Sequence, residues 1–138
     1  MPYNDSIMHI ILFGANGLLG SELAQAIKST SHQIFAYDRQ QADLTETVQI
    51  EKIFLEVHPE FVINAAGYTD VEGAEKNPGD ATLINAVVVH TLARLCKKYD
   101  IPLLHFSTDY VFGDEKKDGY IEDDKPHPLN AYGHSKAR

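Results

Sequence analysis

Tyr132 and Lys136 stand four residues apart in Asn130-Ala131-Tyr132-Gly133-His134-Ser135-Lys136, near the end of the sequence. On a helix, two residues at this spacing share one face. An ammonium beside a phenol favours the phenolate, so this pair could exchange a proton with a carbonyl or an alcohol near neutral pH. The spacing alone is a weak signal, but it follows a strand-terminal Ser107-Thr108 and a glycine-rich turn. We therefore interpret Tyr132 and Lys136 as candidate catalytic residues.

The glycine-rich turn is Gly14-Ala15-Asn16-Gly17-Leu18-Leu19-Gly20, between an apolar run and a segment with helical spacing. Glycines at these places permit a tight turn, close approach of a pyrophosphate and close packing of helix on strand. The helix N-terminus adds N–H donors and partial positive charge for the phosphates. The alternative, a hairpin at Asn16-Gly17, would require an alternating strand next. We therefore predict dinucleotide-binding residues at Gly14, Asn16, Gly17, Leu18, Leu19 and Gly20.

An acid follows the second apolar run: Asp38 comes 18 residues after Gly20. An acid at this place accepts hydrogen bonds from an adenosine ribose, although Asp is also a common turn cap. Arg39 beside it could instead meet a 2′-phosphate. The choice between NADH and NADPH therefore stays open.

Two further segments are candidates for lining the cofactor. Asp43 and Leu44 would lie on the adenine side, while Thr45 has the alternative role of capping the next helix. Asn64-Ala65-Ala66-Gly67 offers small residues at a strand end, which suits either a cofactor or tight packing of helix on sheet.

The elements that must position these residues alternate along the chain. Apolar runs predict strands at 9–13, 33–37, 61–64 and 102–106; helical spacing marks 18–28, 48–57, 81–99 and a beginning helix at 132–138. Such alternation predicts an α/β, Rossmann-like, doubly wound parallel sheet.

We expect a flexible leader at 1–8 and an NAD(P)-binding domain at 9–138. The last helical pattern stops after about two turns without a capping signal. We therefore expect a partial domain, truncated after the start of the Tyr/Lys helix and lacking a C-terminal substrate-binding portion. An exposed sheet edge favours self-association, so a homo-oligomer is among the expected partners.

Charge and composition exclude several classes. A net charge of −8 argues against nucleic-acid or anionic-membrane binding. No apolar run approaches a membrane span and no signal peptide precedes the first strand, which predicts a cytoplasmic protein. The seven histidines lack zinc-like spacing, so we expect no metal site and a packed role for His105. The single cysteine, Cys96, lies in an apolar helical stretch and is expected to be a buried thiol.

Three segments carry a family resemblance: Val62-Ile63-Asn64-Ala65-Ala66, Ser107-Thr108-Asp109-Tyr110-Val111-Phe112 and the Tyr132/Lys136 segment. They resemble the dTDP-4-dehydrorhamnose reductases of the extended short-chain dehydrogenase/reductase superfamily, over nearly the whole chain from His9. The resemblance implies transfer of a hydride from NADPH or NADH to C4 of a dTDP-4-keto-6-deoxy-L-sugar.

In the family's scheme, Tyr132 would donate the proton and Lys136 would hold the nicotinamide ribose. Thr108, the third catalytic residue that the resemblance implies, would hydrogen-bond the substrate oxygen, and Asp109 would contact the sugar. The resemblance thus implies Thr108, Asp109 and Tyr132 as the substrate residues. Positions that match the family's cofactor lining are Gly17, Leu18, Leu19, Asp38, Asp43, Leu44, Gly67, Tyr68 and Thr69.

Tyr110 stands where related dehydratases carry a carboxylate, which favours reduction over dehydration or epimerisation. The family commonly has a lysine where this chain has Gly73. A non-catalytic regulatory subunit with the same fold is the alternative from another class. Without the substrate-binding portion, we expect the 138-residue chain alone to be weakly active or inactive.

Overall fold

The computed structural model describes residues 6–113 and 115–138, so the leader expected at 1–8 lies mainly outside the described residues. The chain forms two compact units. The sheet unit comprises Met1–Ala66 and Thr91–His105. The helical unit comprises Gly67–His90 and Phe106–Arg138.

Four parallel strands make up the sheet of the sheet unit. They are β1 (His9–Phe13), β2 (Gln33–Tyr37), β3 (Phe61–Asn64) and β4 (Leu103–His105), in the order β2-β1-β3-β4. The first three have the predicted bounds, and β4 is shorter than the predicted 102–106. The parallel doubly wound sheet is confirmed.

β1 is the buried centre of this sheet. It pairs with β2 on one side and β3 on the other, and its residues from Ile10 to Phe13 are buried. This burial on both faces explains why β1 is a continuous apolar run without alternation.

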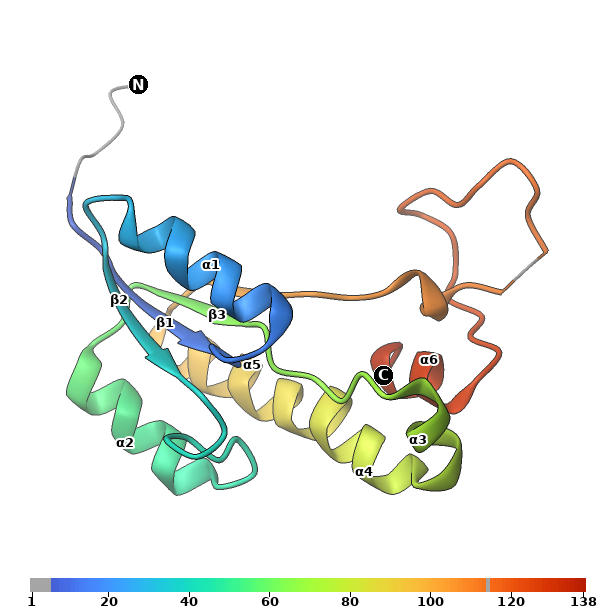
Figure 1. Ribbon diagram of the computed structural model, residues 1–138, viewed down its shortest axis with the longest axis horizontal. Coiled ribbons are helices and arrows are strands. Elements are labelled where there is room, and N and C mark those ends of the chain that lie inside the picture. Colours follow the sequence, from blue (N-terminus) through green and yellow to red (C-terminus); the bar gives the residue numbers. More distant parts are fainter. Residues whose placement is uncertain (1–5, 114) are drawn as a thin grey trace. The chain divides into compact units, whose positions relative to one another are not determined.

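The helices of the sheet unit cover both faces of the sheet. α1 (Leu18–Lys28) lies on one face, and α2 (Thr47–Val57) and the end of α5 (Val88–Tyr99) lie on the other (Figure 1). The Tyr99 hydroxyl donates to Glu51 of α2 at 2.8 Å, and the Tyr99 ring contacts Phe54 with a centroid separation of 6.1 Å.

The strand order creates a point where the chain changes direction. From β1 the chain crosses to β2 on one side, then returns past β1 to β3 on the other side. The loops that follow β1 and β3 therefore diverge at neighbouring carboxyl ends, where open α/β sheets bind their ligands.

The helical unit is built from short elements. They are α3 (Val71–Lys76), α4 (Pro78–Thr82), the π-helical turn η1 (Leu83–Val87), the start of α5, the 3-10 helix η2 (Asp109–Val111) and α6 (Ala131–Lys136). The single helix expected at 81–99 is thus built from α4, η1 and α5. α3 and η2 were not predicted, and α6 begins one residue before the predicted 132 and ends at Lys136.

Side-chain caps explain where the short helices begin. Asp70 accepts a hydrogen bond from the Gly73 amide at 2.9 Å at the start of α3, and Asn130 accepts one from the Gly133 amide at 2.7 Å at the start of α6. Each cap satisfies an amide that has no partner inside its helix.

The single cysteine of the chain lies in α5. Cys96 is 2% exposed, and burial raises its pKa to about 11, so the prediction of a buried thiol is confirmed. Among the described residues, no helix has the length and apolar character needed to cross a membrane.

Candidate active site

The glycine turn is held tightly in the sheet unit. Gly14 has φ +81°, and a Cβ there would lie 2.5 Å from the Ala66 amide nitrogen. A Cβ on Gly20 would overlap the carbonyl oxygen of Gly14. Only glycine permits both this backbone conformation and this close approach.

The first turn of α1 is open to solvent. Gly17 is its N-cap and gives no side-chain hydrogen bond to the helix. Leu18 is 90% exposed and Leu19 is 41% exposed. The first amides of a helix have no intrahelical acceptor, and a phosphate satisfies them well. The first amides of α1 could therefore hold the pyrophosphate of a dinucleotide.

Asp38, at the end of β2, is tied to the glycine turn. Its Oδ2 accepts from the Asn16 side-chain amide at 2.7 Å, and its Oδ1 accepts from the backbone amides of Gln40 and Gln41 at 2.9 Å each. Asp38 therefore caps a turn, which was the predicted alternative to ribose binding, and also bonds the loop that follows β1. Arg39 beside it is exposed.

In the segment Asp43-Leu44-Thr45, the predicted alternative role of Thr45 as a helix cap is wrong. Thr45 does not cap α2, whose N-cap is Glu46. Thr45 instead donates its amide and hydroxyl to Asp43 Oδ1 at 2.9 and 2.7 Å. These bonds lower the pKa of Asp43.

The loop after β3 is fixed by the buried Asn64 side chain and by a backbone hydrogen bond to β1. Asn64 is 1% exposed; its Oδ1 accepts from the Ala66 amide at 3.1 Å and its Nδ2 lies 3.1 Å from His105 Nδ1. The Ala65 amide donates to the Phe13 carbonyl at 3.0 Å. His105 thus has a polar partner in the neighbouring strand, beyond the packing role expected for it.

Within the helical unit, α6 carries both Tyr132 and Lys136, as predicted. Lys136 Nζ donates to the Phe106 carbonyl at 2.6 Å, and burial lowers the pKa of Lys136. The Tyr132 ring contacts the Tyr110 ring edge-on, with a centroid separation of 5.5 Å. A Cβ on Gly133 would overlap the Tyr110 carbonyl oxygen, so α6 packs directly on η2.

Thr108 is thereby brought beside α6. It caps η2 by accepting from the Tyr110 amide at 3.3 Å and donates to Asp109 Oδ1 at 3.1 Å. The helical unit thus assembles Tyr132, Lys136, Thr108 and Asp109, whereas the sheet unit assembles the glycine turn, Asp38, Ala65 and Ala66.

An open pocket of about 800 Å³ has Thr108, Asp109, Phe112 and Tyr120 among its lining residues. The rings of Phe112 and Tyr120 stack at 4.4 Å. A hydroxyl, a carboxylate and aromatic faces together suit a polar ring with apolar edges, such as a sugar.

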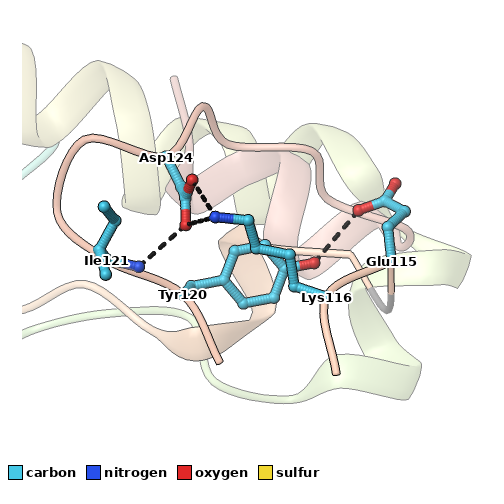
Figure 2. A network of polar contacts seen from close by, with 5 residues as sticks. All are labelled: Glu115, Lys116, Tyr120, Ile121 and Asp124. Atoms are coloured by element: carbon cyan, nitrogen blue, oxygen red, sulfur yellow. Dashed lines mark hydrogen bonds and ion pairs between the residues drawn. The ribbon is translucent and has the colours of Figure 1, made fainter. Parts of the chain in front are cut away.

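Tyr120 is held by the exposed loop that follows η2 (Figure 2). Its hydroxyl donates to Glu115 at 3.1 Å. Asp124 accepts from the Ile121 amide at 2.9 Å and pairs with Lys116. The loop is solvated, as predicted, yet its own side chains fix the pocket wall.

Asn85 is a site residue that the sequence did not reveal. It lies in the π-helical turn, is 4% exposed, and bonds the Tyr68 amide at 2.8 Å, the Tyr68 carbonyl at 2.9 Å and the Ser135 hydroxyl at 2.9 Å. Ser135 in turn donates to the Tyr132 carbonyl at 2.7 Å. The only sign of Asn85 in the sequence is an amide side chain inside the apolar segment 81–89.

The described residues include no group of three His, Cys, Asp or Glu side chains that could hold a metal ion.

Comparison with known proteins gives consistent matches. The family model described as RmlD substrate binding domain matches residues 8–138. The "Probable low-salt glycan biosynthesis reductase Agl14" of Haloferax volcanii is 38% identical over 94% of this chain and 46% of its own length. The dTDP-4-dehydrorhamnose reductase of Burkholderia thailandensis is 40% identical over 94% of this chain and 43% of its own length.

A solved structure is similar over the same extent. The dTDP-4-dehydrorhamnose reductase of Bacillus anthracis, in complex with NADP, superposes with a TM-score of 0.91 at 34% identity, covering 95% of this chain and 47% of that one. The chain therefore spans about half the length of the relatives it matches.

Proposed function

This chain belongs to the family described as RmlD substrate binding domain, and from this premise we propose that it is the cofactor-binding part of an NAD(P)H-dependent sugar-nucleotide reductase. The reaction we propose is reduction of the C4 keto group of dTDP-4-dehydro-L-rhamnose to dTDP-L-rhamnose. One observation carries the proposal: α6, which bears Tyr132 and Lys136, packs on the segment that bears Thr108 and Asp109.

The glycine turn and its neighbours would hold the cofactor, which supplies the hydride when bound. The open first turn of α1 would bind the phosphates through backbone amides. The other residues proposed to line the cofactor are Gly14, Asn16, Leu18, Leu19, Gly20, Asp38, Arg39, Asp43, Leu44, Ala65, Ala66, Gly67, Tyr68, Thr69 and Lys136.

The polar side chains beside α6 would act on the sugar. Tyr132 would donate a proton to the oxygen at C4 as negative charge develops there. Lys136, whose Nζ is positioned by the Phe106 carbonyl, would hold the nicotinamide ribose and favour release of the tyrosine proton. Thr108 would hydrogen-bond the substrate oxygen, and Asp109 would contact the sugar hydroxyls.

A different sugar nucleotide is the second candidate substrate. The Haloferax volcanii relative, at 38% identity, is named as a reductase of glycan biosynthesis, without mention of rhamnose. A panel of dTDP- and UDP-4-keto sugars, assayed by loss of NAD(P)H absorbance, distinguishes the two substrates.

The central test is Tyr132→Phe in the protein that carries this sequence. We expect kcat to fall by about 10² to 10⁴, because the proton donor is lost, with binding of NADPH unchanged. Tyr99→Phe is the matched control, since the Tyr99 hydroxyl donates to Glu51 of α2 and Tyr99 is not among the residues proposed for the site. Unchanged turnover in Tyr132→Phe would remove the proton-donor role. Cofactor binding without reduction of any keto sugar would favour a non-catalytic subunit.

A further inference from the structure

We infer that Glu75 is a positioning residue, which places Tyr132 for proton transfer by holding the first amide of α6. The inference rests on the proposed function, because Tyr132 is the proposed proton donor. It adds a residue of α3, a helix that the sequence pattern did not reveal, to the residues on which the reaction would depend. Glu75 acts through α6 and is not proposed to contact the substrate or the cofactor.

The helix α6 is too short to hold its own position. It has six residues, Ala131–Lys136, with Tyr132 near its start and Lys136 at its end. An isolated helix of this length is unstable in water, because ordering its first turn costs more free energy than its few hydrogen bonds return. The position of each side chain on α6 therefore depends on contacts with other segments.

Contacts with other segments hold the middle and the end of α6. Gly133 packs directly on the Tyr110 carbonyl oxygen. The Ser135 hydroxyl accepts a hydrogen bond of 2.9 Å from the buried side-chain amide of η1, and Lys136 Nζ donates to the Phe106 carbonyl at 2.6 Å. These three contacts all involve residues that follow the proposed proton donor in the chain, so they fix Lys136 better than they fix the first turn.

The first turn of α6 is held by two side-chain acceptors. Asn130 Oδ1 accepts from the Gly133 amide at 2.7 Å, and Glu75 Oε1 accepts from the Ala131 amide at 2.6 Å. Asn130 directly precedes the helix, so this cap moves with the helix. Glu75 lies 56 positions earlier in the sequence, on α3, which contacts α6 within the helical unit (Figure 1). The Glu75 bond therefore ties the first turn, with Tyr132, to a separate element.

The surroundings of Glu75 suit it to this role. A carboxylate that accepts from a helix N-terminus forms a charge-assisted hydrogen bond and complements the positive end of the helix dipole. α3 offers a fixed base, since Asp70 caps its start by accepting from the Gly73 amide at 2.9 Å and Ala74, next to Glu75, is buried. The Glu75 side chain is exposed, so water competes for the carboxylate, and we expect a moderate effect on the rate.

Tyr132 and Lys136 should respond differently when this bond is lost. Tyr132 directly follows the residue whose amide Glu75 holds, whereas Lys136 is held at the other end of α6 by the Phe106 carbonyl. Proton transfer requires hydrogen-bond reach, and a misplacement of about 1 Å can lower a rate by about a hundredfold. Loss of the Glu75 bond should therefore lower kcat and leave cofactor binding, to which Lys136 would contribute, nearly unchanged.

Three substitutions separate the reach of the Glu75 side chain from its charge. Glu75→Gln keeps an acceptor oxygen at the same reach without the charge, Glu75→Asp keeps the charge on a shorter side chain, and Glu75→Ala removes both. In the protein that carries this sequence, we expect Glu75→Ala and Glu75→Asp to lower kcat for keto-sugar reduction by about tenfold, with the Kd of NADPH within about twofold of wild type. Glu75→Gln should keep kcat within about threefold of wild type, because a neutral acceptor makes a weaker bond in the same place. Glu72→Ala, at an exposed glutamate of the same helix, is the matched control and should leave kcat unchanged.

Amide hydrogen exchange, followed by NMR, adds a measurement that does not depend on turnover. Exchange at residues 131–133 should be faster in Glu75→Ala and Glu75→Asp than in wild type and Glu75→Gln, because the first turn of α6 opens more often. The buried amides of β1, at residues 10–13, should exchange at the wild-type rate in all variants. Faster exchange in β1 as well would show a general loss of structure and would overturn the positioning role.

Wild-type kcat in Glu75→Asp would overturn the inference. A Glu75→Gln variant as slow as Glu75→Ala would also overturn it, since charge and not position would then be the cause, and so would an equal loss of kcat and of NADPH affinity. Each of these results leaves the proposed reductase intact. A wild-type protein that binds NADPH but reduces no keto sugar would overturn the proposed function and this inference with it.

Discussion

The Asn85 side-chain amide donates a hydrogen bond of 2.9 Å to the Ser135 hydroxyl, joining residues that lie 50 positions apart. Asn85 also bonds both backbone groups of Tyr68. One buried amide in a π-helical turn therefore holds the loop that follows Gly67 and the helix that carries Lys136. Such turns are frequent at functional sites.

Replacing this amide should be costly. We expect Asn85→Leu, of similar size, to lower the free energy of unfolding by about 2–4 kcal/mol, because the part-buried backbone amide and carbonyl of Tyr68 lose the hydrogen bonds that Asn85 supplies. Urea denaturation measures the change. The exposed Asn77→Ala should change stability by less than about 0.5 kcal/mol. Equal effects in the two variants would contradict the role given to Asn85.

Two helical glycines should respond oppositely to alanine. In Gly20→Ala the new methyl overlaps the Gly14 carbonyl, so we expect a loss of about 3 kcal/mol and weaker NADH binding. In Gly79→Ala the methyl meets nothing within 4 Å, and we expect a gain of about 0.5–1 kcal/mol. Thermal melts of both variants give the comparison, and a neutral Gly20→Ala would show that the turn tolerates a side chain.

The cysteine should be chemically inert in the folded protein. Burial raises the pKa of Cys96 from 9.0 to about 11. This rise leaves about a hundredfold less thiolate at pH 8 than an exposed cysteine has. Labelling by a disulfide reagent should therefore be slow in buffer, rise steadily as pH approaches 11, and become fast in denaturant. Rapid labelling of native protein at pH 7 would contradict the burial.

The loop that holds Tyr120 should lose its order in acid. Hydrogen bonds from His127 lower the pKa of Glu115 below 4.5, and those from Lys116 lower the pKa of Asp124 below 3.8. A lowered carboxyl pKa contributes stability above the ordinary value, and this is lost as pH falls through the lowered value. Tyr120 ring signals in NMR should thus stay constant down to about pH 4 and change below it.

Two adjacent lysines give a matched test of this network. Lys116→Ala should shift the acid transition of the Tyr120 signals toward higher pH, because Asp124 loses the ammonium that pairs with it. Its exposed neighbour allows the control Lys117→Ala, which should leave the transition in place. Coincident transitions in the two variants would show that the Lys116 pair contributes nothing to the loop.

Periodicity in the sequence predicted most of the fold. The strands of the sheet unit and the helices α1 and α2 are long enough to show apolar spacing, and their bounds agree within a residue or two. α3 was not predicted because its six residues are too few to show a periodic pattern, so only its cap at Asp70 marks it. The π-helical turn was not predicted because the hydrogen bonds of Asn85 join residues 17 and 50 positions away, which local periodicity does not reveal.

For the candidate site, the sequence indicates the types of residue but not their hydrogen-bond partners. The Tyr132/Lys136 helix and the glycine turn follow from spacing, since glycine and helical position have local causes. The bond from Lys136 to the Phe106 carbonyl and that from Asn16 to Asp38 join distant segments, and nothing local indicates them. How each candidate residue meets a cofactor stays a prediction.

The uncapped start of α1 makes the melting temperature of this protein a reporter of occupancy. Gly17 has no side chain that could accept hydrogen bonds from the first amides of α1. This turn therefore contributes less to the free energy of unfolding than a capped turn would. Any anion that binds only the folded chain there adds stability by mass action, by about 2.7 kcal/mol at a concentration about one hundred times its Kd. A thermal-shift screen of nucleotides would therefore rank ligands without substrate or turnover.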